Sequence, residues 1–162
     1  MKKIAFLMAV LILTLSLASC GLMGDKTFTV DGLTITVKGF FSEQNDLNEA
    51  YNLILISPDA GVMILKETFS SLEAVGLDTD MTVKKYAEIV MKGNGFTGSP
   101  VEEDGMTYFT YTETADGTEF TYMGFCYRGT DAYWLVQIYC TSEDYESMKP
   151  DMMEWAKSVT LA

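Results

Sequence analysis

The chain has 162 residues with no histidine, and its 11 Lys and Arg against 23 Asp and Glu give a net charge of −12. This charge argues against nucleic acid as a partner, because such binding depends on basic side chains that neutralise phosphates. The lack of histidine excludes a Ser-His-Asp or Cys-His catalytic centre and the usual histidine-containing zinc sites.

The first predicted element is an export signal over residues 1–19. A short positive start is followed by an apolar run over residues 4–17, which only two hydroxyl side chains interrupt. As a helix this run is about 21 Å long, which is short of the roughly 30 Å hydrocarbon core of a bilayer. A signal-peptide segment is therefore favoured over a permanent transmembrane helix.

The apolar run ends in Leu17-Ala18-Ser19-Cys20, which resembles the bacterial lipobox. In that motif the cysteine receives a diacylglycerol group, so we expect cleavage before Cys20 and lipidation of its thiol. The alternative is an ordinary secretory signal that happens to contain a cysteine. The expected location is the extracytoplasmic side of a cell membrane, with the lipid as the only membrane contact, because two acyl chains anchor stably.

Cleavage leaves 143 residues with 9 basic and 23 acidic side chains, a net charge of −14. That length fits one domain with a hydrophobic core, which we place at residues 27–162. Residues 20–26 form a short tether of at most about 20 Å. The acidic surface argues against electrostatic docking on anionic lipid.

Hairpins dominate the predicted domain. Alternating apolar and polar residues flank Asp31-Gly32, and the same dipeptide recurs at Asp104-Gly105 and Asp116-Gly117. An Asp-Gly pair between such runs is the strongest short signal for a two-residue hairpin turn.

Five further strands follow from turn signals and alternation, at residues 52–56, 62–65, 106–114, 118–128 and 132–141. Most of them are joined by short turns, so the sheet is expected to be mainly antiparallel.

Two segments show helical spacing. The first has Asp80 as a possible N-cap and ends at Gly93. The second lies near the C-terminus, where Ser142 is a candidate cap and Pro150 a natural restart. A last short strand is possible at residues 159–161. The apolar positions expected to share a helix face are Val83, Tyr86, Ala87, Val90 and Met91 in the first segment and Tyr145, Met148, Met152, Trp155, Ala156 and Val159 in the second.

The strand at residues 132–141 is apolar on both faces, unlike a strand of a sheet that is wet on one side. Helices are therefore expected on both faces, which gives an α+β fold, a three-layer α/β/α sandwich with a mainly antiparallel sheet. Cys126 and Cys140 lie on adjacent predicted strands about 17–20 Å apart, beyond the reach of a disulfide. Both are expected to be buried free thiols.

The C-terminal half carries a family resemblance. Its helix ends in Gly93-Asn94-Gly95, three long strands follow, and Tyr133-Trp134-Leu135-Val136-Gln137 precedes an acidic turn and a final helix. This order resembles the PsbP/Mog-type fold, including the DcrB-like bacterial lipoproteins. The resemblance implies an antiparallel sheet between helices and an accessory role at a membrane or in an envelope. It implies no active site, and the histidine ligands of metal-binding PsbP relatives are absent here.

The sequence offers a cysteine, two acidic runs and a glycine-rich segment as candidates for chemistry. Cys126 lacks a histidine base and is favoured as a structural thiol. The acidic runs 78–80 and 102–104 could offer oxygen ligands to calcium, but helix capping and a charged hairpin are favoured. The glycine-rich segment 93–98 follows a helix, whereas a phosphate site needs the start of one.

Two classes of function stay open from the sequence. The first is a non-catalytic accessory module that binds a protein partner at the membrane surface and needs no cofactor or metal. The second is a small-ligand binder or hydrolase with a pocket of paired carboxylates. We expect the first, with no enzymatic activity. Four tyrosines could leave a partly exposed aromatic patch, namely Tyr108, Tyr111, Tyr122 and Tyr127.

Overall fold

The computed structural model describes residues 24–44 and 48–162. The predicted signal over residues 1–19 and the predicted lipidation site Cys20 lie outside the described residues. Among the described residues, no helix has the length and apolar character that crossing a membrane requires.

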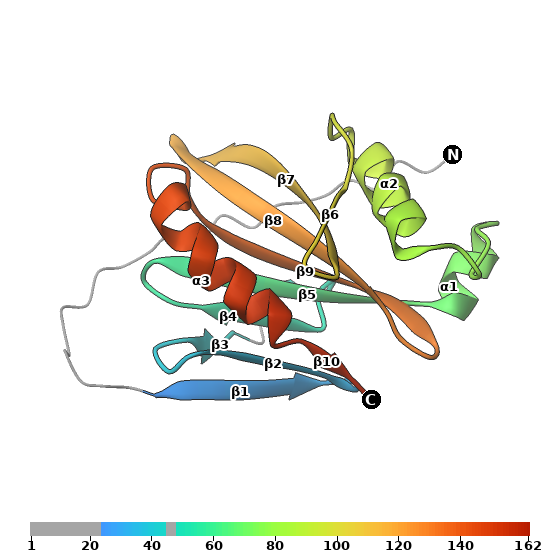
Figure 1. The fold of residues 1–162 in the computed structure, drawn as a ribbon, viewed down its shortest axis with the longest axis horizontal. Coiled ribbons are helices and arrows are strands. Elements are labelled where there is room, and N and C mark those ends of the chain that lie inside the picture. Colours follow the sequence, from blue (N-terminus) through green and yellow to red (C-terminus); the bar gives the residue numbers. More distant parts are fainter. Residues whose placement is uncertain (1–23, 45–47) are drawn as a thin grey trace.

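A small sheet joins the two ends of the domain (Figure 1). It contains β1 (Asp25–Val30), β2 (Leu33–Lys38) and β10 (Thr160–Leu161) in the order β1-β2-β10. The predicted last strand is therefore present as β10. Because β1 begins at Asp25, the last two residues that we assigned to the tether belong to the folded domain.

The main sheet has seven strands in the order β3-β4-β5-β9-β8-β7-β6, and every pairing is antiparallel. The three long strands agree with the prediction to within one residue. The strands are β3 (Ser42–Glu43), β4 (Leu53–Ile56), β5 (Ala60–Thr68), β6 (Val101–Glu103), β7 (Met106–Ala115), β8 (Thr118–Arg128) and β9 (Ala132–Thr141).

The three Asp-Gly turns form as predicted. Asp31 and Gly32 have φ angles of 47° and 94°, and the other two pairs have positive φ at both residues as well. Two successive positive φ angles define the tight hairpin turn whose twist matches that of the flanking strands. The local dipeptide therefore determines the register of β1 with β2, of β6 with β7 and of β7 with β8.

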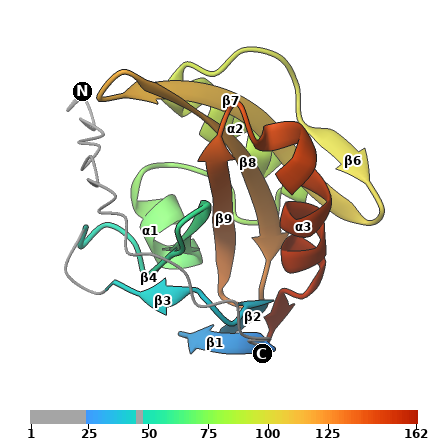
Figure 2. The same ribbon diagram turned by 90° about the vertical axis from the view of Figure 1, so that its left-hand side faces the viewer.

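Helices lie on both faces of the main sheet (Figure 2). α3 (Tyr145–Lys157) packs on one face together with the small sheet, while α1 (Phe69–Ala74) and α2 (Val83–Asn94) lie on the other. The two faces carry separate apolar cores, with Trp134 in the larger one and Leu135 in the smaller one. This arrangement confirms the predicted α+β class, with the small sheet as an addition that we did not predict.

The ends of α2 differ from the prediction. Thr82 is the N-cap, and its hydroxyl accepts a hydrogen bond of 3.1 Å from the Lys85 backbone N–H. Asp80 lies too early for this role and instead pairs with Arg128 at 3.2 Å. The helix continues past Gly93 to Asn94. Gly95 follows as the C-cap in a left-handed conformation (φ 75°), which glycine adopts without strain.

The final helix also differs at its start. Asp144 occupies the N-cap position without a capping hydrogen bond from its side chain, so the predicted cap Ser142 is wrong. The Ser142 hydroxyl instead lies 2.8 Å from the Thr121 hydroxyl. Pro150 does not restart the chain but lies inside α3, where the helix loses one backbone hydrogen bond because proline has no N–H.

The two described cysteines are free and buried, as predicted. Cys126 pairs with Leu135 in the ladder between β8 and β9, while Cys140 lies opposite Thr121. Cys126 belongs to the core under α2 and Cys140 to the core under α3. The sheet itself therefore separates the two thiols.

Candidate binding surface

The helices cover only part of the sheet face on which α1 and α2 lie. Leu72 of α1 and Tyr86, Ala87 and Met91 of α2 pack against Leu135 and its neighbours in the smaller core. Further along the same face lie aromatic side chains and one carboxylate, which come from β7, β8 and β9 and from Tyr51 just before β4. We call this group the tyrosine face, and it comprises Tyr51, Tyr111, Glu113, Phe120, Tyr122 and Tyr139.

The sheet register brings the tyrosines into one row. Tyr111 of β7 pairs with Tyr122 of β8, and Tyr122 pairs with Tyr139 of β9. Directly paired side chains in adjacent strands share a face and are close enough to interact. The Tyr111 and Tyr122 rings are stacked at 4.8 Å with 8° between their planes, and the Tyr122 and Tyr139 rings are 5.0 Å apart.

Aromatic residues extend the row at both ends. Phe96, which follows α2, stacks on Tyr111 with 3.9 Å between the ring centroids. Phe120 meets Tyr139 edge to face at 6.0 Å. Each offset or edge contact between rings contributes stability beyond that of the area the rings bury. The row is therefore a continuous series of ring contacts across three strands, with Tyr122 buried and its neighbours partly exposed.

Two glycines provide room for large rings on this face. A Cβ at Gly61 would lie 2.2 Å from the Tyr139 ring, and a Cβ at Gly124 would lie 2.6 Å from the Phe109 ring. Glycine is the only residue that allows a ring to lie this close to a neighbouring strand. The positions of Tyr139 and Phe109 thus depend on the absence of a side chain at these two sites.

Glu113 is the acidic member of the tyrosine face. It lies two residues after Tyr111 and opposite Phe120, and its side chain is half-buried. Burial raises the pKa of its carboxyl group, because a desolvated carboxylate is less stable than a hydrated one. Within the described part of the chain, the carboxylate has no hydrogen bond or ion pair.

The phenol groups around Glu113 are held neutral. Burial together with the nearby negative charge of Glu113 raises the pKa of Tyr51 to about 12 and raises the pKa of Tyr111 and Tyr122 as well. The Tyr51 hydroxyl also lies 3.5 Å from the side-chain oxygen of the buried Gln137. The face thus presents neutral hydroxyl groups beside one acidic side chain.

The predicted, partly exposed patch of four tyrosines does not form. Tyr111 and Tyr122 share the tyrosine face, but Tyr122 is buried, and Tyr108 and Tyr127 lie on the opposite face of the sheet. The Tyr108 hydroxyl donates to Glu103 at 2.7 Å, and the Tyr127 hydroxyl donates to the Ala156 carbonyl at 2.8 Å. Both hydroxyls are therefore occupied by contacts that hold the fold together.

Sequence reasoning missed Tyr51, Glu113, Phe120 and Tyr139 as members of this surface. For Glu113 and Phe120 the missed signal is strand alternation. Glu113 follows Tyr111 by two residues and Phe120 precedes Tyr122 by two, so each pair must share a face once the strand is assigned.

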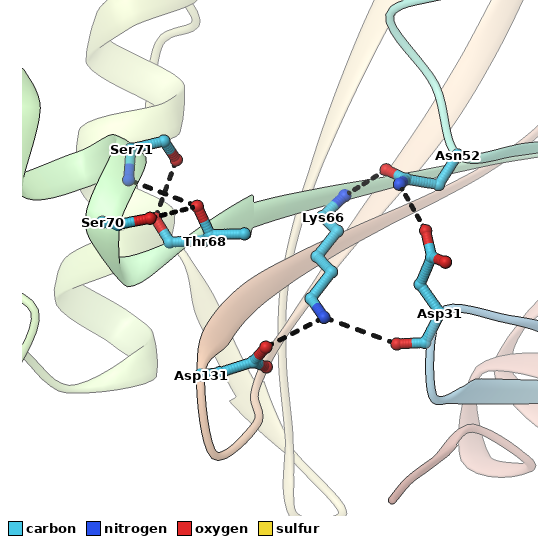
Figure 3. Close-up of polar contacts among 7 residues, drawn as sticks. All are labelled: Asp31, Asn52, Lys66, Thr68, Ser70, Ser71 and Asp131. Carbon is cyan, nitrogen blue, oxygen red and sulfur yellow. Dashed lines mark hydrogen bonds and ion pairs between the residues drawn. The ribbon is translucent and has the colours of Figure 1, made fainter.

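A polar network around Lys66 joins the two sheets (Figure 3). The Lys66 ammonium donates to the Asp131 carboxylate at 3.1 Å and to the Asp31 carbonyl at 3.4 Å, and it lies 5.2 Å from the Trp134 ring centroid. The Asn52 amide donates to the Asp31 carboxylate at 2.9 Å. Every group of this network has a partner within the molecule, so its role is structural.

The acidic runs considered for calcium are engaged in surface pairs. Glu102 pairs with Lys84 at 2.8 Å and Asp104 pairs with Lys157 at 2.6 Å. No group of three or more potential metal ligands occurs among residues 24–44 and 48–162. Burial and the charge of Glu67 raise the pKa of the Cys126 thiol, which opposes formation of a nucleophilic thiolate.

Neither a family model nor a curated protein matches the sequence. Solved structures do. A crystal structure of a protein from Bacteroides thetaiotaomicron matches with a TM-score of 0.60 at 16% identity, over 86% of this chain and 49% of that chain. The chain thus spans about half the length of that protein.

Two further structures match over nearly the full length of both chains. The solution structure of cyanobacterial PsbP (CyanoP) from Synechocystis sp. PCC 6803 gives a TM-score of 0.53 at 12% identity, over 91% of this chain and 98% of that one. LpqN of Mycobacterium tuberculosis, which is involved in cell envelope biogenesis, gives 0.50 at 10% identity, over 85% and 90%.

These similarities confirm a PsbP-like fold, as the order of elements in the C-terminal half predicts. At these levels of identity the likeness concerns the fold and not the activity. The resemblance to DcrB-like lipoproteins in particular stays a prediction.

Proposed function

We propose that this protein is a lipoprotein of the bacterial cell envelope, anchored through Cys20, and that it acts by binding a protein partner at the membrane surface. The observation that carries the proposal is the tyrosine face. It is an aromatic row that begins at the edge of the core under α2, with Tyr122 buried at its centre and Tyr111, Phe120 and Tyr139 partly exposed around it.

Aromatic side chains are typical of the energetic centre of protein interfaces, because they bury much apolar area with little loss of conformational entropy. The rings of the tyrosine face are already held by stacking, so ordering them on binding adds little further penalty. The phenol groups supply hydrogen-bonding capacity that a purely apolar patch lacks.

The expected anchor complements such a surface. A domain held within about 20 Å of the bilayer searches for partners along the membrane only. Tethering of this kind raises the effective concentration of a membrane neighbour, so a modest interface is sufficient. An envelope role is also in keeping with LpqN, whose fold this chain shares.

The catalytic alternative has weaker support. A hydrolase of the paired-carboxylate type needs two carboxyl groups that face each other across the substrate. Glu113 has the raised pKa that such a site requires. Burial causes this shift, however, and not the charge of a second, facing carboxylate. The proposal is therefore a non-catalytic module, and hydrolase activity that depends on Glu113 would contradict it.

Photocrosslinking in native membranes tests the proposal. A photoreactive phenylalanine analogue is placed at Tyr111, and the matched control carries it at Thr112, whose exposed side chain lies on the other face of the same strand. We expect a defined protein adduct from position 111 that is absent from position 112. The captured protein must then bind the purified lipoprotein. Equal adducts from both positions, or none, would contradict the proposal.

A further inference from the structure

We infer that the tyrosine face accepts an arginine side chain of the protein partner, with Glu113 as its counter-ion and the tyrosine rings as its stacking surface. This inference rests on the proposed function and adds the chemistry of the partner. It starts from two arrangements that the molecule already contains.

The first arrangement surrounds Arg128, on the same sheet face as the tyrosine row. Its guanidinium lies 5.4 Å from the Phe69 ring centroid and 5.9 Å from that of Tyr133. It pairs with Asp80 at 3.2 Å and donates to the Thr79 carbonyl at the same distance. One arginine thus contacts two aromatic rings, a carboxylate and a carbonyl oxygen at once.

The second arrangement is the Lys66 network. It also combines a cation, an aromatic ring and a carboxylate, here those of Trp134 and Asp131. In both arrangements the chain supplies all three parts. A cation next to an aromatic ring and a carboxylate is stabilised by both, and most strongly where water is partly excluded.

The tyrosine face has two of these parts. Glu113 supplies a half-buried carboxylate, and the partly exposed Tyr111 and Phe120 supply rings beside it, with the buried Tyr122 behind them. The ion pairs of the described residues all use other acids. A partly desolvated carboxylate without a counter-ion is unfavourable, and an incoming cation would relieve this penalty. The net charge of −12 attracts a cation to the same surface.

The chemistry of the face favours arginine over a metal ion or an ammonium group. A hard cation requires several oxygen ligands with charge, whereas Glu113 is surrounded by neutral phenols. The planar guanidinium stacks on aromatic rings and can donate to both oxygens of one carboxylate. Its remaining N–H groups can donate to phenol oxygens, as the second N–H contact of Arg128 does to Thr79.

Peptide binding to the mature lipidated protein in a non-ionic detergent provides the test. The probes are three glycine-rich peptides that differ at one position, which is arginine, lysine or citrulline. Citrulline keeps the shape of arginine but has no charge. We expect the arginine peptide to bind a few-fold more tightly than the lysine peptide, and about tenfold more tightly than the citrulline peptide.

The protein variants are Glu113→Gln and the matched control Glu119→Gln. Both remove one negative charge, but Glu119 is exposed on the opposite face of the sheet. We expect Glu113→Gln to weaken the arginine peptide about tenfold and Glu119→Gln to have little effect. If a variant fails to fold, the affinities of the three peptides for the wild-type protein still test the inference.

Three outcomes would overturn the inference. The first is equal binding of arginine and citrulline peptides, and the second is equal loss in the two glutamine variants, which would indicate general attraction to an acidic surface. The third is binding of phosphatidylcholine vesicles that Glu113→Gln abolishes, which would make a lipid headgroup the ligand. If either of the first two outcomes occurs while the photocrosslinked adduct at position 111 still forms, the arginine inference fails but the proposed protein-binding function stands.

Discussion

Gly61 lies directly opposite Tyr139 in the ladder between β5 and β9, and the Tyr139 ring occupies the space in which a side chain at Gly61 would stand. A Cβ at position 61 would lie 2.2 Å from this ring. Because Gly61 has no side chain, the Tyr139 ring of the tyrosine face can pack directly against the backbone of β5.

Replacing Gly61 with alanine should displace the Tyr139 ring. The clash is with a ring that is itself packed against Tyr122 and Phe120, so we expect a loss of about 1–3 kcal/mol in the free energy of unfolding, as for other overpacked sites. Urea unfolding measures it.

Gly93→Ala is the matched control for this substitution. Gly93 lies within α2, where a Cβ meets nothing within 4 Å, so alanine should stabilise the protein by about 0.5–1 kcal/mol. A Gly61→Ala variant as stable as wild type would show that Tyr139 can move without penalty.

The start of α2 gives a second prediction. Thr82→Ala removes the side-chain oxygen that accepts from the Lys85 N–H, and we expect a loss of about 1 kcal/mol in the free energy of unfolding. Asp80→Ala removes only an exposed pair with Arg128 and should cost about 0.5 kcal/mol or less. If Asp80→Ala is the more damaging of the two, the helix begins where the sequence pattern alone suggests.

These two residues illustrate how far the sequence predicts the fold. The Asp-Gly turns depend on a local dipeptide, so three hairpin registers could be predicted. Asp80 and Thr82 are both good capping residues, and only the packing of α2 on the sheet decides between them. The pairing of Gly61 with Tyr139 joins residues far apart in the chain, and no local signal indicates it.

The candidate surface was predictable in part for the same reason. The pairing of Tyr111 with Tyr122 follows from the turn at Asp116-Gly117, which sets the register of the two strands. The assignment of Tyr108 to the same patch ignored alternation, because residues three apart in a strand lie on opposite faces. Tyr51 lies outside any strand, and its approach to Gln137 could not be foreseen.

The thiols give a third prediction. Protein purified without reductant and then unfolded should show two free side-chain thiols, because the sheet separates Cys126 from Cys140. In the native state both should react slowly with a thiol reagent, because burial raises their pKa. Finding no free thiol in monomeric protein would contradict the strand register.

The anchor gives a fourth prediction. Cys20→Ala should abolish labelling by a radioactive fatty acid, because the motif Leu17-Ala18-Ser19-Cys20 offers only this thiol to the lipid. The variant should also fail to undergo normal lipoprotein processing, because the expected cleavage directly precedes Cys20. Cys140→Ala is the control and should keep full labelling. Labelling of Cys20→Ala at the wild-type level would contradict the lipoprotein proposal.

The unpaired carboxylate of Glu113 gives the last prediction, which concerns pH. Burial raises the pKa of Glu113 in the folded state above its value in the unfolded chain. The ionised group therefore destabilises the fold. This penalty is absent below the unfolded pKa, near 4.3, and grows as the pH rises through the folded pKa.

Glu113→Gln removes the charge and should abolish this dependence. In the absence of a partner, we expect the variant to be more stable than wild type at pH 7, with a difference that shrinks towards zero at pH 4 and below. Urea unfolding across this pH range measures the difference. The control Glu119→Gln, at an exposed position, should show no such trend. A variant that is less stable than wild type at pH 7 would mean that the Glu113 carboxylate already has a favourable partner within the chain, and the case for a cation from outside would then fail.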